Sequence, residues 1–271
     1  MAHWSLNDID WQAFDGGKVA PALVSLAKSA CMVEHNGRDY ARYLCEVFAD
    51  DADFQGVAHQ WAEEEVQHGQ ALRRWAELAD PSFNFDESFK AFTDGYKLPA
   101  GVGASVRGSR SGELIARCVV ESGTSTYYTA ISEYTDEPVL KQICARIAAD
   151  EFRHYKLFYT HLKRYLEKEK MGRLKRFIVA LGRIAESEDD ELSYAFYTAH
   201  RGGNQEKYDR KIYAKRYLAE ATRVYRKEHI ERLTAMVMKA VGLKPNGWLN
   251  RVFGALAWRA MQLRSGVAEA A

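Results

Sequence analysis

The sequence predicts an all-α protein in which four long helices form a bundle and further helices follow toward the C-terminus. Only five of the 271 residues are proline, whereas Ala, Leu, Glu, Lys and Arg, which favour helices, are abundant. Apolar residues recur at helical spacing through most of the chain. They make up 47% of the residues, which suffices for one large core or for a core with an added layer.

The first two predicted helices form a hairpin. After a mixed lead-in over residues 1–18, apolar residues keep helical spacing from 19 to 49. Asn36-Gly37 weakens this stretch, but the periodicity resumes after it. A turn rich in aspartate around Asp51 supplies an N-cap, and a second helix is predicted over 54–79.

A second hairpin is predicted after a long crossover. Residues 80–110 are rich in glycine and proline and are expected to be irregular. The third helix is predicted over 111–134, and Pro138 is well placed as the first residue of a fourth helix that ends near Lys168. Because the crossover is long, the second hairpin can pack against the first and complete a bundle.

Further helices are expected beyond Gly172. Their predicted ranges are 173–200, 205–241 and 248–263. No linker is long or polar enough to mark a second domain. We therefore expect one domain over 1–271, with a four-helix core at about 19–169 and a C-terminal helical extension at about 173–264.

Each predicted hairpin carries the same pattern of glutamate and histidine. A lone glutamate, Glu34 or Glu121, comes first, and a Glu-x-x-His pair follows it. The pairs are Glu65 with His68 and Glu151 with His154. The glutamates are 31 residues apart in the first hairpin and 30 apart in the second. This repetition indicates a two-metal site inside a helical bundle.

Helix geometry allows the six side chains to meet. Residues three apart share one face of a helix, so each Glu-x-x-His pair can aim two ligands at one point. At about 1.5 Å rise per residue, the lone glutamate and the pair in each hairpin lie at similar depths from their shared turn. Four carboxylates and two imidazoles suit two iron or manganese ions, whereas structural zinc usually takes thiolates.

The alternative for each motif is a solvated helix face, which is common for isolated Glu-x-x-His pairs. The neighbouring residues argue against it. Glu34 follows Cys31-Met32-Val33, and Glu121 follows Cys118-Val119-Val120. Acidic groups on apolar faces are costly unless they are paired or ligated.

Two segments resemble the soluble acyl-acyl-carrier-protein desaturases of the stearoyl type, which belong to the ferritin-like diiron superfamily. The segments are AEEEVQHGQAL at 62–72 and LKQICARIAADEFRHYKLFYTHLKRYLE at 140–167. With Glu34 and Glu121, the resemblance extends over about 25–167. It implies a ferritin-like bundle and a centre of two irons. It also implies an O₂-dependent enzyme that takes electrons from a ferredoxin-type donor. The substrate would be a fatty acyl chain on acyl carrier protein, and members are usually homodimers.

The resemblance also implies roles for individual residues. The four glutamates and two histidines match the family's metal ligands, and Thr124 matches a threonine beside its oxygen-binding face. The alternative for Thr124 is a hydroxyl bonded back to its own helix. Glu64 and Asp150 each precede a ligating glutamate and could accept a hydrogen bond from the opposite histidine. A plain ion pair between helices is the alternative for both.

The chain also departs from the family pattern. It is shorter before Glu34 and in the crossover, and the family's residues for choosing the carrier-bound substrate cannot be mapped. Tyr127 and Tyr128 would shorten an acyl cavity if they line it, although core packing is the ordinary role of such residues. Two alternative functions therefore remain: a diiron oxygenase acting on another substrate, and a non-catalytic iron-binding protein.

Bulk properties narrow the location and the partners. The formal net charge is +1, which gives no general preference for nucleic acid. No apolar run reaches the length of about 18 residues that a spanning helix needs, and the N-terminus does not read as a signal peptide. The four cysteines form no close sequence pair. These features favour reduced thiols and a cytoplasmic location.

Three C-terminal stretches suggest contact surfaces. Residues 163–183 are rich in Lys and Arg and could receive an acidic acyl carrier protein or ferredoxin, or could simply be exposed. Tyrosines interleave with basic residues over 207–232, which suggests either RNA contact or, as the helical spacing favours, a buried stripe. The amphipathic stretch from Trp248 could touch a membrane, but packing on the bundle or on a second subunit is favoured.

Overall fold

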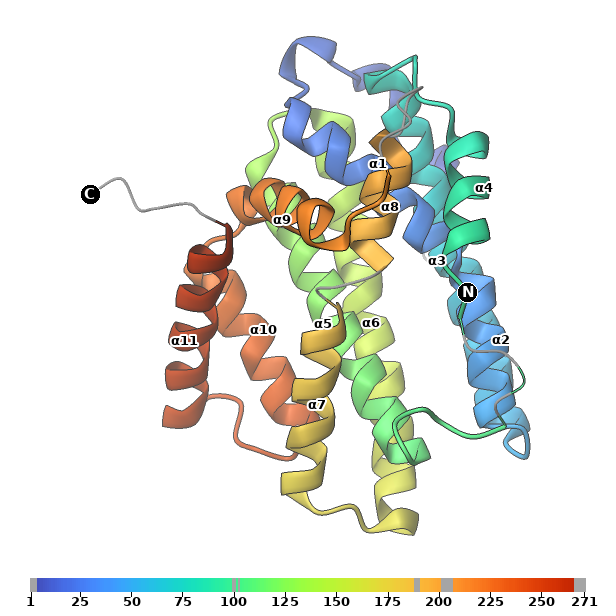
Figure 1. The fold of residues 1–271 in the computed structure, drawn as a ribbon, viewed down its shortest axis with the longest axis vertical. Coiled ribbons are helices and arrows are strands. Elements are labelled where there is room, and N and C mark those ends of the chain that lie inside the picture. The colour runs from blue at the N-terminus through green and yellow to red at the C-terminus, as the bar shows by residue number, and fades with distance from the viewer. Residues whose placement is uncertain (1–3, 99–100, 102, 188–190, 201–206, 266–271) are drawn as a thin grey trace.

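The computed structural model describes the chain except for residues 1–3, 99–100, 102, 188–190, 201–206 and 266–271. All regular elements in the described part are helices, which confirms the predicted all-α class. Four helices form a bundle: α1 (Pro21–His35), α3 (Ala52–Ala79), α5 (Arg110–Tyr134) and α6 (Pro138–Glu169) (Figure 1). In this bundle α1 packs on α3, and α5 packs on α6.

Two helix starts agree with the predicted caps. The side chain of Asp51 accepts a hydrogen bond from the backbone N–H of Phe54 and so caps α3. At the start of α6, Pro138 is the first helical residue, and the fully buried Glu137 accepts from the N–H groups of Val139 and Leu140.

The prediction of a single helix over 19–49 is wrong. The chain breaks at Asn36 into α1 and α2 (Gly37–Val47). A Cβ atom placed on Gly37 would lie 2.6 Å from the Cβ of Glu65, so glycine permits a close approach to α3 at this break. The Asn36-Gly37 pair therefore marks a change of helix direction beside Glu34.

The prediction of irregular structure over 80–110 is also wrong in part, because this segment contains α4 (Phe85–Gly95). Asn84 caps this helix by accepting from the N–H of Glu87. Phe85, Phe89 and Phe92 recur at helical spacing and pack against the core. The glycines and prolines around α4 conceal this short pattern in the sequence.

The C-terminal part forms an outer layer on the bundle. Its elements are α7 (Arg173–Ser187), α8 (Glu191–His200), α9 (Arg210–Ala221), a 3₁₀ turn (Thr222–Val224), α10 (Lys227–Ala240) and α11 (Trp248–Ser265). α8 packs on α1, α7 and α10 pack on α5, and α11 packs on α10. The continuous helix predicted over 205–241 is therefore interrupted, at the 3₁₀ turn between α9 and α10. The helix predicted over 173–200 corresponds to α7 and α8, and residues 188–190 between them lie outside the described residues.

The predicted tyrosine stripe packs inward rather than facing a ligand. Tyr213 and Tyr217 are buried on α9, and Tyr208 and Tyr225 pack against the same core while partly buried. This arrangement confirms the predicted buried stripe.

The apolar interior consists of two clusters of side chains. One joins α1 and α8 to the C-terminal half of α3, and it includes Leu26 and Leu72. The other joins α2 and α7 to the N-terminal half of α3, and it includes Phe54 and Leu162. On α3 the two clusters are separated by the turns that carry Glu65 and His68. The polar residues thus occupy a layer between two apolar cores.

Candidate metal centre

The four bundle helices bring all six predicted ligands to this polar layer. Glu34 comes from α1, Glu121 from α5, and α3 and α6 each supply a Glu-x-x-His pair. Their ligand atoms form two groups, and within each group the atoms lie within 4.8 Å of one another. One group is Glu34, Glu65, His68 and Glu151, and the other is Glu65, Glu121, Glu151 and His154. Glu65 and Glu151 belong to both groups, so each could serve both positions if two cations were bound.

Each of the six residues is buried and has one polar atom without a hydrogen-bond partner. These atoms are Oε2 of Glu34, Oε1 of Glu65, Nδ1 of His68, Oε1 of Glu121, Oε1 of Glu151 and Nδ1 of His154. Buried polar atoms without a partner are costly. Mixed oxygen and nitrogen ligands of this kind fit two cations such as iron or manganese. The donor set therefore fits a dimetal centre.

Acidic residues outside the centre orient the two imidazoles. Nε2 of His68 lies 3.1 Å from Oδ2 of Asp150, and Nε2 of His154 lies 3.0 Å from Oε2 of Glu64. If each Nε2 carries the proton and donates it, each Nδ1 lone pair points into the centre. Both carboxylates act across the hairpins, as predicted, although an ion pair is also present because Arg153 bridges Glu64 and Asp150.

Trp4 contributes a contact that the sequence does not reveal. Its indole N–H donates to Oδ2 of Asp150 at 2.7 Å, and its ring stacks on His68 with centroids 6.0 Å apart. Trp4 lies 146 residues from Asp150 in an irregular lead-in. No periodic pattern therefore links the two residues.

Two hydroxyl groups on α5 reach carboxylates of the centre. Oγ1 of Thr124 donates to Oε2 of Glu151 at 2.7 Å, and it also lies 3.3 Å from the backbone oxygen of Val120. Both roles considered for Thr124 are therefore compatible with its position. The buried Tyr128 donates to Oε1 of Glu34. It therefore serves core packing and also contacts a predicted ligand.

The electrostatics of the centre without a cation are unfavourable for four carboxylates. Burial raises the pKa of Glu65 and of Glu121, and the neighbouring carboxylate of Glu151 raises the pKa of both further. Burial alone would lower the pKa of His154, but contacts with Glu151 and Glu64 raise its pKa to about 10. Without a cation, bound protons therefore offset the negative charge of the four carboxylates, which a metal ion would also offset.

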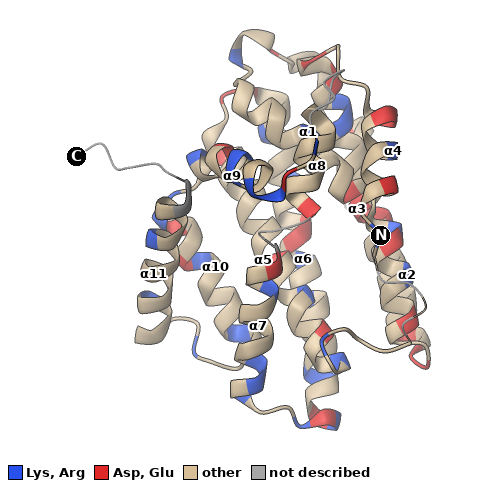
Figure 2. Ribbon diagram, viewed as in Figure 1, with Lys and Arg blue, Asp and Glu red and all other residues tan. Residues whose placement is uncertain are grey.

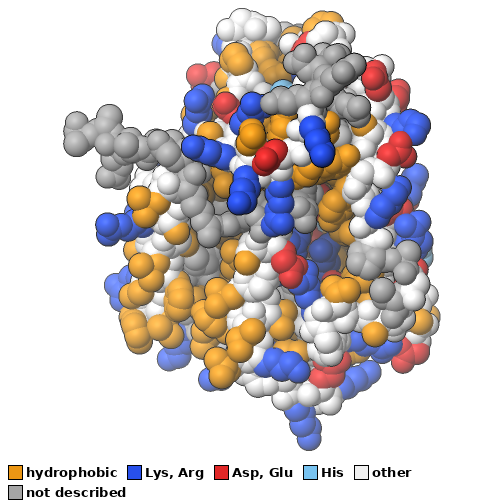
Figure 3. All heavy atoms as spheres, in the orientation of Figure 1, with side chains coloured by type: hydrophobic (Ala, Val, Ile, Leu, Met, Phe, Trp, Pro, Cys, Tyr) orange, Lys and Arg blue, Asp and Glu red, His pale blue; other side chains and the backbone are white. Residues whose placement is uncertain are grey.

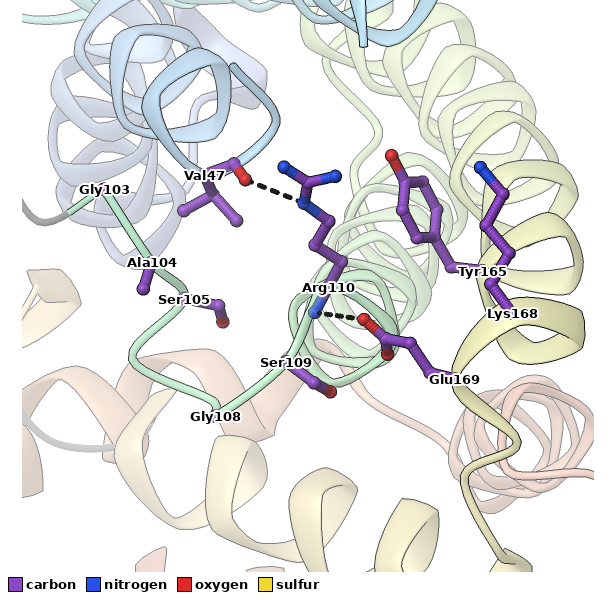
Figure 4. A pocket seen from close by; sticks show the side chains of 10 residues that line it. All are labelled: Val47, Gly103, Ala104, Ser105, Gly108, Ser109, Arg110, Tyr165, Lys168 and Glu169. Carbon is purple, nitrogen blue, oxygen red and sulfur yellow. Dashed lines mark hydrogen bonds between the residues drawn. The ribbon is translucent and has the colours of Figure 1, made fainter. Parts of the chain in front are cut away.

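Two pockets differ in their relation to the centre. A pocket of about 140 Å³ opens between α3 and α6 and is bordered by Trp61, Glu64, Arg153 and His154. A larger pocket of about 540 Å³ lies where α5 begins and α6 ends (Figure 4). There Glu169 accepts from the backbone N–H of Arg110, and the Arg110 side chain donates to the carbonyl of Val47. Only the smaller pocket is lined by a predicted ligand.

None of the helices that the structure describes is long and apolar enough to cross a membrane.

The family model for "Fatty acid desaturase" matches residues 39–184. This segment includes every predicted ligand except Glu34. No curated protein matches the chain. Because the match covers more than half of the chain, the protein belongs to the fatty acid desaturase family, whose name denotes oxidoreductases acting on acyl chains.

Proposed function

We propose that the protein is an O₂-dependent, non-haem diiron desaturase that acts on a fatty acyl chain carried by acyl carrier protein. The observation that carries this proposal is the pair of ligand groups sharing Glu65 and Glu151, with an unpartnered atom on all six residues. Family membership supports an acyl substrate. The thioester carrier rests on the sequence resemblance alone.

In this proposal Glu34, Glu65, His68, Glu121, Glu151 and His154 hold two irons, and manganese suits the same ligands. The irons would supply the activation of O₂. Asp150 and Glu64 hold the histidine rings in register, and Tyr128 fixes one oxygen of Glu34. Thr124 is the proposed catalytic residue because it matches the family's threonine beside the oxygen-binding face, and its hydroxyl donates to the proposed ligand Glu151.

We also propose that 1–271 forms one ferritin-like domain. Helices after Gly172 contribute side chains to both apolar clusters of the bundle, for example Phe196 to one and Met236 to the other. A shared interior supports a single folding unit.

The proposed partners are acidic acyl carrier protein, a ferredoxin-type donor and a second subunit. Some basic residues of 163–183 are engaged within the chain and are not available to a partner. Arg164 pairs with Asp51, and Arg176 donates to the carbonyl of Met171. Lys163, Lys168 and Lys170 are exposed and are the proposed contacts for an acidic carrier.

Metal analysis tests the centre. Anaerobic loading with Fe(II) should give about two irons per chain. His68→Ala and Glu151→Ala should bind less iron while keeping the helical circular dichroism of the wild type. Glu63→Gln is a matched control because Glu63 is exposed on α3 and pairs with Arg38. A wild-type protein that cannot be loaded would refute the proposal.

Product analysis tests the reaction. The loaded protein is supplied with O₂, ferredoxin, its reductase and panels of acyl-carrier-protein and acyl-CoA substrates. Mass spectrometry should show the loss of two hydrogens from a carrier-bound chain. Gain of one oxygen would indicate an oxygenase, and turnover of acyl-CoA alone would reject acyl carrier protein as the carrier.

A further inference from the structure

Exposed apolar side chains gather on two helices of the outer layer. Among the described residues, twelve large apolar side chains are exposed, and eight of them lie on α7 or α11. On α7 these are Leu174, Ile178, Leu181 and Ile184; on α11 they are Trp248, Val252, Leu256 and Leu263. The other four are spread over separate parts of the fold. We call these eight residues the α7/α11 face.

The two helices form one continuous surface. The rings of Phe177 on α7 and Phe253 on α11 lie 5.5 Å apart and join the helices beneath the face. Residues of the face are three, four or seven positions apart, which places them along one side of each helix. In the space-filling view these apolar side chains lie together at the lower left (Figure 3).

Among the described residues on and beside these two helices, exposed basic side chains outnumber acidic ones. Exposed bases on or beside the two helices are Arg173, Lys175, Lys244, Arg251 and Arg259. α11 contains no acidic residue (Figure 2). The acidic residue near the end of α7, Glu186, pairs with Arg107. The acidic Glu231 of α10 lies beside Gly254 of α11 and pairs with Lys227. An apolar surface edged mainly by basic residues is complementary to a surface that is both apolar and anionic.

The size of the exposure also needs an explanation. Leu174 is 74% exposed, Trp248 is 67% exposed and Leu263 is 75% exposed. Single exposed apolar residues are common on monomers, but contiguous groups of this kind mark sites that contact a partner or a membrane.

A second copy of the chain is a poor occupant. A twofold dimer built on this face would place the same patch against itself. Arg251 and Arg259 of α11, a helix without acidic residues, would then approach their own equivalents, and like charges at an interface are costly.

We propose that the α7/α11 face binds the surface of an anionic phospholipid bilayer. The aliphatic tips and the indole of Trp248 would enter the boundary between headgroups and acyl chains, as they do in interfacial amphipathic helices. The bases at its edge would contact lipid phosphates. The protein would lie on the bilayer, which agrees with the absence of a spanning helix in the described residues.

Cosedimentation with vesicles tests this proposal. The full chain should bind vesicles of phosphatidylcholine mixed with phosphatidylglycerol, should bind pure phosphatidylcholine far less, and should release as salt increases. On binding, the fluorescence of Trp248 should shift to shorter wavelength, and Trp248→Phe should remove that shift.

Matched variants separate the face from general effects. Leu256→Glu should weaken vesicle binding by about tenfold or more, because the variant loses the burial of one leucine side chain in the bilayer. Leu78→Glu is the control, because Leu78 is an exposed leucine on α3. Arg251→Glu with Arg259→Glu should abolish the lipid-charge dependence. Arg42→Glu with Lys90→Glu changes the net charge equally on α2 and α4 and should have little effect.

Several results would overturn the proposal. These are no binding to anionic vesicles, equal binding by the face variants and their controls, or a stable dimer in solution that Leu256→Glu dissociates. Binding of an acidic acyl carrier protein to the face without any vesicle binding would also reject the bilayer as its occupant. Vesicle binding requires no turnover, so its failure leaves the proposed desaturase function untouched.

Discussion

At the scale of single residues, each histidine of the centre is held from outside by a carboxylate. Asp150 is the more connected of the two carboxylates, because it also accepts from Trp4 and pairs with Arg153. The charge of this group makes the opposite ring nitrogen a better metal ligand. The orientation of His68 therefore depends on a residue that is not itself among the proposed ligands.

Asp150→Asn should lower the affinity for Fe(II) by about 10- to 100-fold while leaving the stoichiometry at saturation unchanged. Glu64→Gln should do the same through His154. Competition with a chelator measures the affinity. Glu63→Gln on the exposed side of α3 should leave it unchanged, and an equal loss in all three variants would contradict the assigned role.

A second residue-scale prediction concerns acid stability. Hydrogen bonds from Lys28 and then Ser82 lower the pKa of Asp80 to about 2. A carboxyl whose pKa is lower in the folded state contributes stability that is fully present above its unfolded pKa of about 4 and is lost as pH falls toward about 2.

Because the Asp80 side chain is 31% exposed, solvent reduces this contribution to about 1–2 kcal/mol. Asp80→Asn should lower the free energy of unfolding by that amount at neutral pH, and by much less below about pH 3. Urea unfolding at several pH values measures the difference. The exposed Asp136 provides a control through Asp136→Asn, and a loss for Asp80→Asn that is independent of pH would reject the explanation.

The sequence predicts the six candidate ligands because they obey a repeat and a helical spacing. The contacts of Trp4, Arg153 and Tyr128 with carboxylates of the centre are not predicted by the repeat or by the helical spacing. Trp4 and Tyr128 contact carboxylates 146 and 94 residues away, respectively. Contacts at that separation depend on how the segments pack, which helical periodicity does not specify.

At the scale of helices, glycine sets the distance between α1 and α3 beside the centre. A Cβ on Gly69, next to His68, would lie 2.6 Å from the backbone nitrogen of His35 and 2.9 Å from the carbonyl oxygen of Cys31. Backbone atoms cannot move aside as a flexible side chain can. The two helices would have to separate to admit a methyl group.

Gly69→Ala should therefore destabilise the fold by about 1–3 kcal/mol and weaken Fe(II) binding, because His68 moves with α3. Gly56→Ala is the matched control on the same helix, since nothing lies within 4 Å of its added Cβ. That variant should gain about 0.5–1 kcal/mol from helix propensity. Thermal unfolding and iron titration measure both effects, and similar results for the two variants would contradict the close-contact argument.

Helix positions follow the apolar pattern closely, but interruptions do not. The bounds predicted for the third and fourth helices differ from α5 and α6 by at most a residue at each end. The break at Asn36 and the insertion of α4 depend on close packing against neighbouring helices. Local propensity weakens a helix at Asn36-Gly37 but cannot fix where the chain turns.

At the scale of the whole molecule, the polar layer is the place where the bundle lacks apolar packing. Without cations, this layer holds four buried carboxylates, and burial raises the pKa of Glu65 and Glu121. Metal bound at the proposed centre would replace these protons with positive charge held by side chains from all four helices. Metal binding should therefore stabilise the fold as a whole.

Addition of Fe(II) or Mn(II) to the metal-free protein should raise Tm by about 10 °C when the metal exceeds its Kd about a thousandfold. The rise should shrink in acid, because protons compete for the same carboxylates. Scanning calorimetry under anaerobic conditions measures it. His68→Ala should show little rise, and a metal-free protein as stable as the loaded one would contradict the coupling.

The division of the interior into two apolar cores has a consequence for how the protein tolerates change. Leu72 and Leu162 lie in different cores, on opposite sides of the polar layer. Truncations to alanine at these two positions should have additive effects on the free energy of unfolding, to within about 0.5 kcal/mol. Two truncations within one core should not be additive. One end of the bundle can therefore acquire substitutions without requiring compensating changes at the other end.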